Sequence, residues 1–76
     1  MELEKRIRNI REAYGMTQAE VAYNANMSPQ AYGKIERRAS KTKLETLLKI
    51  ANAIGVSIKF LIDIENSEYF EYKNNL

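Results

Sequence analysis

The chain has 76 residues, of which 45% are hydrophobic and 29% are charged, a composition typical of one small globular domain. It contains no cysteine and no histidine, which excludes disulfides, a cysteine nucleophile, histidine acid–base catalysis and most zinc and iron–sulfur sites. No apolar run approaches the roughly 18 residues of a membrane helix, and residues 1–25 contain no apolar block typical of a signal peptide. We therefore expect a cytoplasmic domain with no membrane partner.

The charges are distributed unevenly along the chain. Residues 1–43 carry nine Lys and Arg against five Glu, a net charge of +4, whereas residues 44–76 carry three Lys against five acidic residues, a net charge of −2. No acidic residue occurs between Glu36 and Glu45, and that stretch holds four basic residues. A short basic block can mark a surface for a polyanion, but on charge alone a solvated face is the better interpretation.

The first predicted helix covers residues 3–14. Its apolar residues recur at spacings of four, three and four, which gives the helix one apolar face. These residues are Leu3, Ile7, Ile10 and Tyr14. Gly15 then predicts the end of the helix. Thr17 and Glu20 have the spacing of a capping box, which predicts a second helix that ends near residues 24–26.

Three more helices follow. Ser28 and Pro29 predict the start of the third, because serine caps a helix and proline suits its first position. The polar and basic residues 37–43 predict a loop. The apolar face of the fourth helix consists of Leu44, Leu47, Leu48, Ala51 and Ile54. Gly55 predicts the end of that helix, and Ser57 predicts the start of a short fifth helix that carries Ile58, Leu61 and Ile62.

The second and third predicted helices are separated by only two or three residues. So short a link predicts a steep crossing, as in a helix-turn-helix. Small or apolar residues occupy the positions that this motif buries, namely Val21, Ala22, Ala25, Met27, Tyr32 and Ile35. We expect Tyr23 to lie in the core or to cover it. The chain is therefore predicted to be all-α, with one domain over residues 1–66 and a tail of aromatic and acidic residues over 67–76.

Several segments of the chain, taken together, are typical of one family. They are residues 10–11, 15–22, 28, 35–37, 44–51 and 53–57. In this combination the chain resembles, over residues 3–64, the Cro/C1-type (Xre-like) helix-turn-helix transcriptional regulators. The resemblance implies a compact five-helix, lambda-repressor-like domain. It also implies a homodimer that inserts its third helices into the major groove of a palindromic operator.

The resemblance implies roles for individual residues. The base-facing positions are Pro29, Gln30, Ala31 and Lys34. The positions that contact DNA phosphates are Thr17, Gln18, Arg37, Arg38, Lys41 and Lys43. In the family, the residue at the position of Gln18 also supports a side chain at the start of the third helix. Arg11 and Glu36 would form a structural salt bridge, and the dimer interface would include Ile58, Lys59 and Phe60.

The chemistry of the base-facing residues supports these roles unevenly. Gln30 can pair with adenine N6 and N7, and Lys34 can donate to guanine O6 and N7. The methyl group of Ala31 can touch the methyl group of thymine. Pro29 has no donor and a fully apolar side chain, so it reads no base by hydrogen bonding.

Three residues depart from the family pattern, and the first is Pro29, because family members often have a polar residue at that position. Arg38 stands where the family commonly has glycine, so either the third helix runs longer or Arg38 or Ala39 strains into the turn. Gly33 lies inside the third helix, where glycine costs about 1 kcal/mol relative to alanine. It either lets the backbone approach DNA closely or leaves room for Tyr32 or a neighbour, and the sequence does not decide between them.

An alternative is an antitoxin or a restriction–modification controller-like protein that acts partly through a partner protein such as a toxin or polymerase. The tail aromatics Tyr69, Phe70 and Tyr72 would suit a partner, a contact with the first helix, a dimer contact or no contact at all. An enzyme is not supported, because the chain has no His, no Cys and no clustered carboxylates. We expect no cofactor, no metal and no small-molecule ligand.

Overall fold

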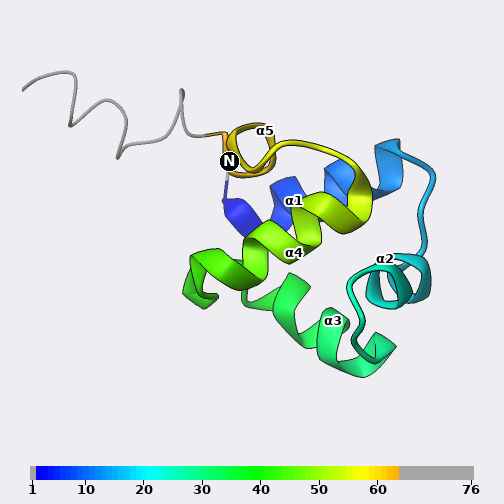
Figure 1. Ribbon diagram of the computed structural model, residues 1–76. Helices are drawn as coiled ribbons and strands as arrows, with labels where there is room; N and C mark the ends of the chain where they lie inside the picture. The colour runs from blue at the N-terminus through cyan, green and yellow to red at the C-terminus, as the bar shows by residue number, and fades with distance from the viewer. Residues whose placement is uncertain (1, 64–76) are drawn as a thin grey trace, which may run out of the picture.

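The computed structural model describes residues 2–63, and this part of the chain contains five α-helices, one 3₁₀ helix and no β-strand. The helices are α1 (Leu3–Ala13), α2 (Gln18–Asn24), α3 (Pro29–Arg37), η1 (Ala39–Lys41), α4 (Leu44–Ile54) and α5 (Ile58–Ile62). In Figure 1, α4 crosses the middle of the molecule, with α5 above it and α3 below it. The predicted all-α, five-helix fold is confirmed.

The core forms around α4. Five of the eleven residues of this helix are buried, and the other α-helices have one to three buried residues each. The largest fully buried side chains are Tyr32, Ile7, Ile50, Leu61 and Val21. The apolar periodicity of the sequence thus identifies the inner faces of α1 and α4 correctly at most positions.

Four large apolar residues that were expected to face inward are exposed instead. Tyr14 and Tyr23 are 53% and 82% exposed, so the expectation that Tyr23 covers the core is wrong. Leu44 and Leu48 are 60% and 40% exposed. The buried face of α4 is centred near Leu47, and Leu48 lies one residue step, about 100°, around the helix from it.

The predicted caps form. The Thr17 hydroxyl accepts from the Glu20 amide at 3.0 Å and the Glu20 carboxylate accepts from the Thr17 amide at 2.8 Å, which completes the capping box. Ser28 and Ser57 accept from amides three residues ahead, at 3.1 and 3.0 Å. Gly55 ends α4 with a φ of 96°, in the left-handed region that glycine adopts without strain.

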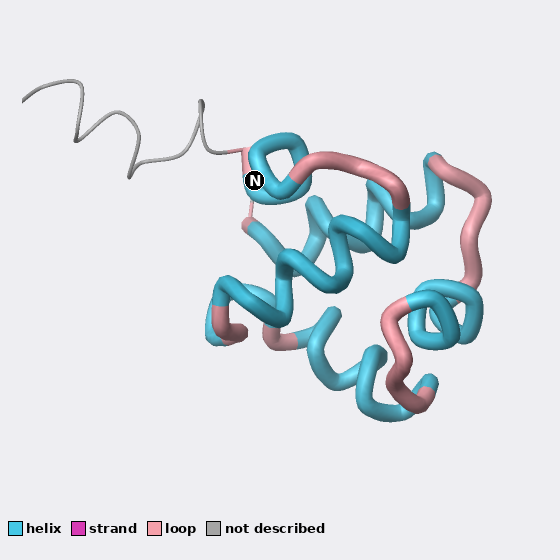
Figure 2. The backbone as a smooth tube through the Cα atoms, viewed as in Figure 1, coloured by secondary structure: helices cyan, strands magenta, loops and turns pink. Residues whose placement is uncertain are grey.

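The turn between α2 and α3 is short and internally bonded (Figure 2). Asn26 adopts a φ of 59°, and the Met27 amide donates to the Ala22 carbonyl at 2.9 Å. In that view α2 is seen nearly end-on while α3 runs across the picture, so the two helices cross steeply. The Asn24 side chain donates to the Ala53 carbonyl at 3.1 Å and so ties the end of α2 to α4.

The segment after α3 differs from the predicted loop. Arg37 is the last residue of α3, and residues 39–41 form the 3₁₀ helix η1 with Ala39 buried. Arg38 has a φ of −131°, and Ala39 also has no positive φ, so neither residue adopts a strained left-handed conformation. The helix does not extend beyond Arg37. The amide and hydroxyl of Ser40 both donate to the Glu4 carboxylate, which fixes this turn to α1.

Candidate nucleic-acid interface

The two faces of α3 have opposite characters. Its outward side chains are exposed, and they are Pro29, Gln30, Ala31, Lys34 and Arg37. Its inward residues are Tyr32, Gly33 and Glu36, all buried. Gln30, Lys34 and Arg37 follow one another at spacings of four and three, so their side chains share one face of the helix.

A set of cations continues beyond this outward face. Arg38, Lys41 and Lys43 are exposed and lie in or beside the turn that follows α3. Within residues 2–63, these three side chains and those of Lys34 and Arg37 form no ion pair. At the start of α2, Thr17 is exposed and Gln18 is half-buried. The structure therefore brings the predicted phosphate-contacting residues onto the elements that border the outer face of α3.

Glu36 is the centre of a buried polar network that joins three helices. Its Oε2 accepts from Arg11 Nε of α1 at 2.8 Å and from the Tyr32 hydroxyl at 2.5 Å. Its Oε1 accepts from Arg11 Nη2 at 3.2 Å and from Gln18 Nε2 of α2 at 3.1 Å. Arg11 also donates through Nη1 to the Met16 carbonyl at 2.8 Å. Gln18 thus supports Glu36 in the last turn of α3, not a residue at the start of that helix.

The network keeps Glu36 ionised. Burial acts to raise the pKa of Glu36, but the hydrogen bonds from Arg11, Tyr32 and Gln18 outweigh it and hold the pKa below its ordinary value. Burial and the contact with Glu36 raise the pKa of the Tyr32 hydroxyl, so Tyr32 stays a neutral donor. The hydrogen bond to Glu36 raises the pKa of Arg11.

The lowered pKa of Glu36 predicts a loss of stability in acid. Its contribution is complete above its ordinary pKa of 4.5 and is lost as the pH falls through the lower value of the folded state. We expect the free energy of unfolding, measured by urea titration at a series of pH values, to fall below pH 4.5. The variant Glu36→Gln should show a shallower fall than the parent protein, and an equally steep fall would contradict this role of Glu36.

Gly33 lies on α3 beneath two side chains from its surroundings. A Cβ atom at this position would lie 3.4 Å from Arg37 Nη1 and 3.6 Å from Gln18 Oε1. The side chains of Gln18 and Arg37 therefore lie directly over the backbone of α3 at Gly33. Both distances are those of ordinary van der Waals contact, so a methyl group would fit here and neither explanation left open by the sequence follows from the packing of the domain.

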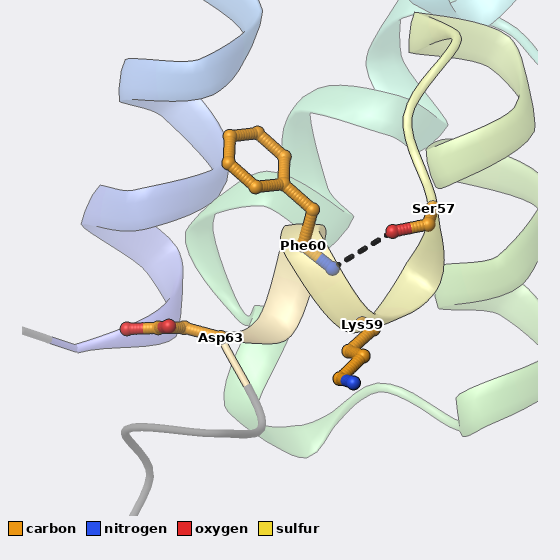
Figure 3. Close-up of a pocket in the computed structure, with 4 residues that line it drawn as sticks. All are labelled: Ser57, Lys59, Phe60 and Asp63. Atoms are coloured by element: carbon orange, nitrogen blue, oxygen red, sulfur yellow. Dashed lines mark hydrogen bonds between the residues drawn. The ribbon is translucent and has the colours of Figure 1, made fainter.

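The residues expected at a dimer interface lie on α5. Lys59 is exposed, Phe60 is 48% exposed, and Ile58 is half-buried against the core. In Figure 3 the ring of Phe60 points toward α1 and Lys59 extends from the other side of α5.

Two contacts that hold the fold around this site were not predicted from the sequence. Arg6 bonds the end of α5, and Glu4 bonds Ser40 in the turn after α3. Hydrogen bonds from Ser40 lower the pKa of Glu4. Both contacts join residues at least 36 positions apart, and no local pattern in the sequence signals them.

Residues 2–63 were also searched for a metal site and for a membrane-spanning helix. Among residues 2–63 no cluster of His, Cys, Asp and Glu side chains is suited to hold a metal ion. In the same part of the chain, every helix is too short or too polar to cross a bilayer.

The fold and this surface define a helix-turn-helix protein, in which α2 and α3 form the motif and α3 presents an exposed polar face. The family model described as "Helix-turn-helix" matches residues 7–61. The chain belongs to this family, in its Cro/C1-type branch.

Two curated relatives are similar to the chain. One is the "SPbeta prophage-derived uncharacterized HTH-type transcriptional regulator YonR" of Bacillus subtilis, 31% identical over 65 residues, which are 86% of this chain and 60% of that protein. Another is the "Cryptic phage CTXphi transcriptional repressor RstR" of Vibrio cholerae, 36% identical over 58 residues, which are 76% of this chain and 52% of that protein. The chain therefore spans little more than half of the length of these relatives. No solved structure matches the chain significantly.

Proposed function

We propose that the chain is a sequence-specific, double-stranded DNA-binding transcriptional regulator, and specifically a repressor. The observation that carries the proposal is the outer face of α3, which exposes Gln30 and Lys34 and is bordered by cations that have no ion pair among the described residues. Membership of the helix-turn-helix family and a relative named as a transcriptional repressor support it.

In this proposal α3 enters the major groove. Gln30 and Lys34 bond base edges, Ala31 touches a thymine methyl group, and Pro29 packs there without a hydrogen bond. Phosphates are bound by Thr17, Gln18, Arg37, Arg38, Lys41 and Lys43. The phosphate contacts supply most of the affinity and make it depend on salt, whereas the base contacts supply the sequence preference.

One domain makes too few base contacts to select a single genomic site. We therefore propose a homodimer on a palindromic operator, with half-sites about 34 Å apart. Its interface includes Ile58, Lys59 and Phe60 of α5, and the exposure of Phe60 supports this assignment. Binding over a promoter would then exclude the polymerase.

Selection of bound DNA from a random pool tests the function directly. A palindromic motif that is enriched reproducibly would support both the sequence preference and the dimer. A motif without symmetry would support sequence-specific binding and contradict the dimer. Recovery of no motif would contradict sequence-specific binding.

Gln30→Ala is expected to relax the preference at one base pair in each half-site, by about 1–3 kcal/mol of discrimination. The measurement is the ranking of single-base operator variants by their dissociation constants. Asn52→Ala, which removes an exposed amide from α4, is the matched control and should leave the ranking unchanged. An unchanged ranking for Gln30→Ala would remove Gln30 from the base-reading set.

Phe60→Glu is expected to convert the dimer into a monomer, because it would place two carboxylates in the apolar part of the proposed interface. Sedimentation equilibrium measures the outcome. Tyr23→Glu makes the same replacement of an exposed aromatic residue on α2 and should leave the dimer intact. A Phe60→Glu chain that still dimerises would show that the interface lies elsewhere.

A second candidate function is that of an antitoxin or a restriction–modification controller-like protein, in which a protein partner such as a toxin or polymerase shares the role. The observation in its favour is the hollow lined by Met16, Ala19, Glu20, Tyr23 and Asn24, beside the highly exposed ring of Tyr23. A selection that enriches no DNA motif would favour this candidate.

A further inference from the structure

The helix α5 is too short to be stable by itself. It contains five residues, whereas isolated helices below roughly 12 residues are marginal in water. The Ser57 hydroxyl caps its first turn. The conformation of α5 therefore depends on contacts from outside the helix.

Arg6 of α1 supplies those contacts. Its Nε lies 3.2 Å from the carbonyl oxygens of both Phe60 and Leu61, and its Nη2 donates to the Phe60 carbonyl at 2.6 Å. Its guanidinium lies 5.2 Å from the centroid of the Phe60 ring, within the range of a cation–π contact. Its Nη1 is 4.0 Å from a carboxylate oxygen of Asp63, the residue that ends α5. One side chain thus holds the backbone, the aromatic ring and the terminus of α5.

Phe60 remains 48% exposed although it is held in this way. In Figure 3 its ring stands clear of the α5 backbone on the side toward α1. An exposed aromatic side chain in a fixed orientation is well suited to anchor an interface, because little conformational entropy is left to lose on association. The guanidinium of Arg6 makes these contacts within the fold, so we do not include Arg6 among the cations proposed to bind DNA.

We infer that Arg6 is the positioning residue for the surface through which two copies of this chain associate. The inference rests on the dimer proposed above and adds the residue that builds its interface. Arg6 acts through Phe60 and the end of α5, and the contacts described above are all with Phe60, Leu61 and Asp63.

The test compares Arg6→Ala with Arg8→Ala in the full 76-residue chain. Arg8 is exposed on the same helix, so the control removes the same charge from α1. By sedimentation equilibrium, Arg6→Ala should weaken self-association by at least about tenfold, the loss expected when charged hydrogen bonds that order an interface are removed. Arg8→Ala should leave it unchanged.

Two further variants test how Arg6 acts. One asks whether its positive charge alone is sufficient, and the other asks whether it acts through Phe60. Arg6→Lys keeps the charge but lacks the fork that reaches two carbonyl groups, so it should also weaken the dimer. In a Phe60→Ala background, Arg6→Ala should add little further loss, because the two residues act as one unit.

A tandem of two chains joined by a flexible linker provides the decisive readout. With the linker in place, Arg6→Ala should bind a selected palindrome as tightly as the parent tandem, although the unlinked variant binds it weakly. An Arg6→Ala chain that self-associates normally, or a tandem that stays weak, would overturn the role of Arg6 and leave the proposed function standing. A parent chain that is monomeric on its operator would overturn the dimer and this inference together.

Discussion

Replacing Glu36 with alanine is expected to lower the free energy of unfolding by about 3–5 kcal/mol, because it leaves a buried arginine without its counter-charge. A chain of this size has a total stability of roughly 4–11 kcal/mol. The variant should therefore lose a large fraction of its stability. Urea titration followed by far-UV circular dichroism at pH 7 measures the change. Glu36→Gln, which keeps the shape of the side chain, should lose less.

Glu12→Ala is the matched control for Glu36→Ala. Glu12 also faces Arg11, with its carboxylate 3.8 Å from Nη2, but its side chain is 60% exposed. An exposed ion pair contributes about 0–1 kcal/mol, so Glu12→Ala should change the unfolding free energy by less than that. If both variants lowered the free energy of unfolding by the same amount, burial would not explain the contribution of the Arg11–Glu36 pair to stability.

Replacing both Lys41 and Lys43 with alanine is expected to weaken binding to every DNA sequence and to flatten its salt dependence. Both lysines are exposed at the turn after α3. Each lost phosphate contact should reduce the slope of log K against log salt by about 1, and so by about 4 for a dimer that carries two such turns. The order of preference among operator variants should not change. Fluorescence anisotropy at several salt concentrations measures both quantities.

Lys49→Ala is the control for this pair of substitutions. Lys49 is exposed on α4 and lines a hollow beside Asn24, Asn26 and Asn52, outside the proposed phosphate-binding set. Its removal lowers the net charge but should leave the salt slope nearly unchanged. A double variant with an unaltered slope would remove Lys41 and Lys43 from the phosphate contacts, and a lower slope in the control would point to a non-specific effect of charge.

The five α-helices were predictable because local chemistry sets many of their limits. Thr17, Ser28 and Ser57 cap helices through bonds to amides three residues ahead, and Gly15 and Gly55 adopt positive φ values that end them. Such signals depend on neighbours in the chain alone, so a single sequence contains them in full. The 3₁₀ helix at residues 39–41 escaped prediction because three residues are too few to show a period.

The contacts between distant elements could not be predicted in the same way. The network around Glu36 follows in part from family resemblance, and the spacing of four between Tyr32 and Glu36 is compatible with their hydrogen bond. The role of Arg6 depends on where α5 packs, 54 residues further along the chain. The exposure of Leu44 and Leu48 likewise depends on which side of α4 its neighbours cover, and an apolar pattern alone does not determine this.

The division of α3 into an inner and an outer face has a consequence for how such a protein can diversify. Glu36 and Tyr32 are buried and hydrogen-bonded to each other, whereas the side chains of Gln30, Ala31 and Lys34 are exposed. If these residues read bases as proposed, substitutions at the three positions should redirect the domain to a new operator while its melting temperature stays nearly constant. Gln18 is the exception, since its amide group is bonded to Glu36 and the residue also belongs to the proposed phosphate-binding set, so a change there should alter recognition and stability together.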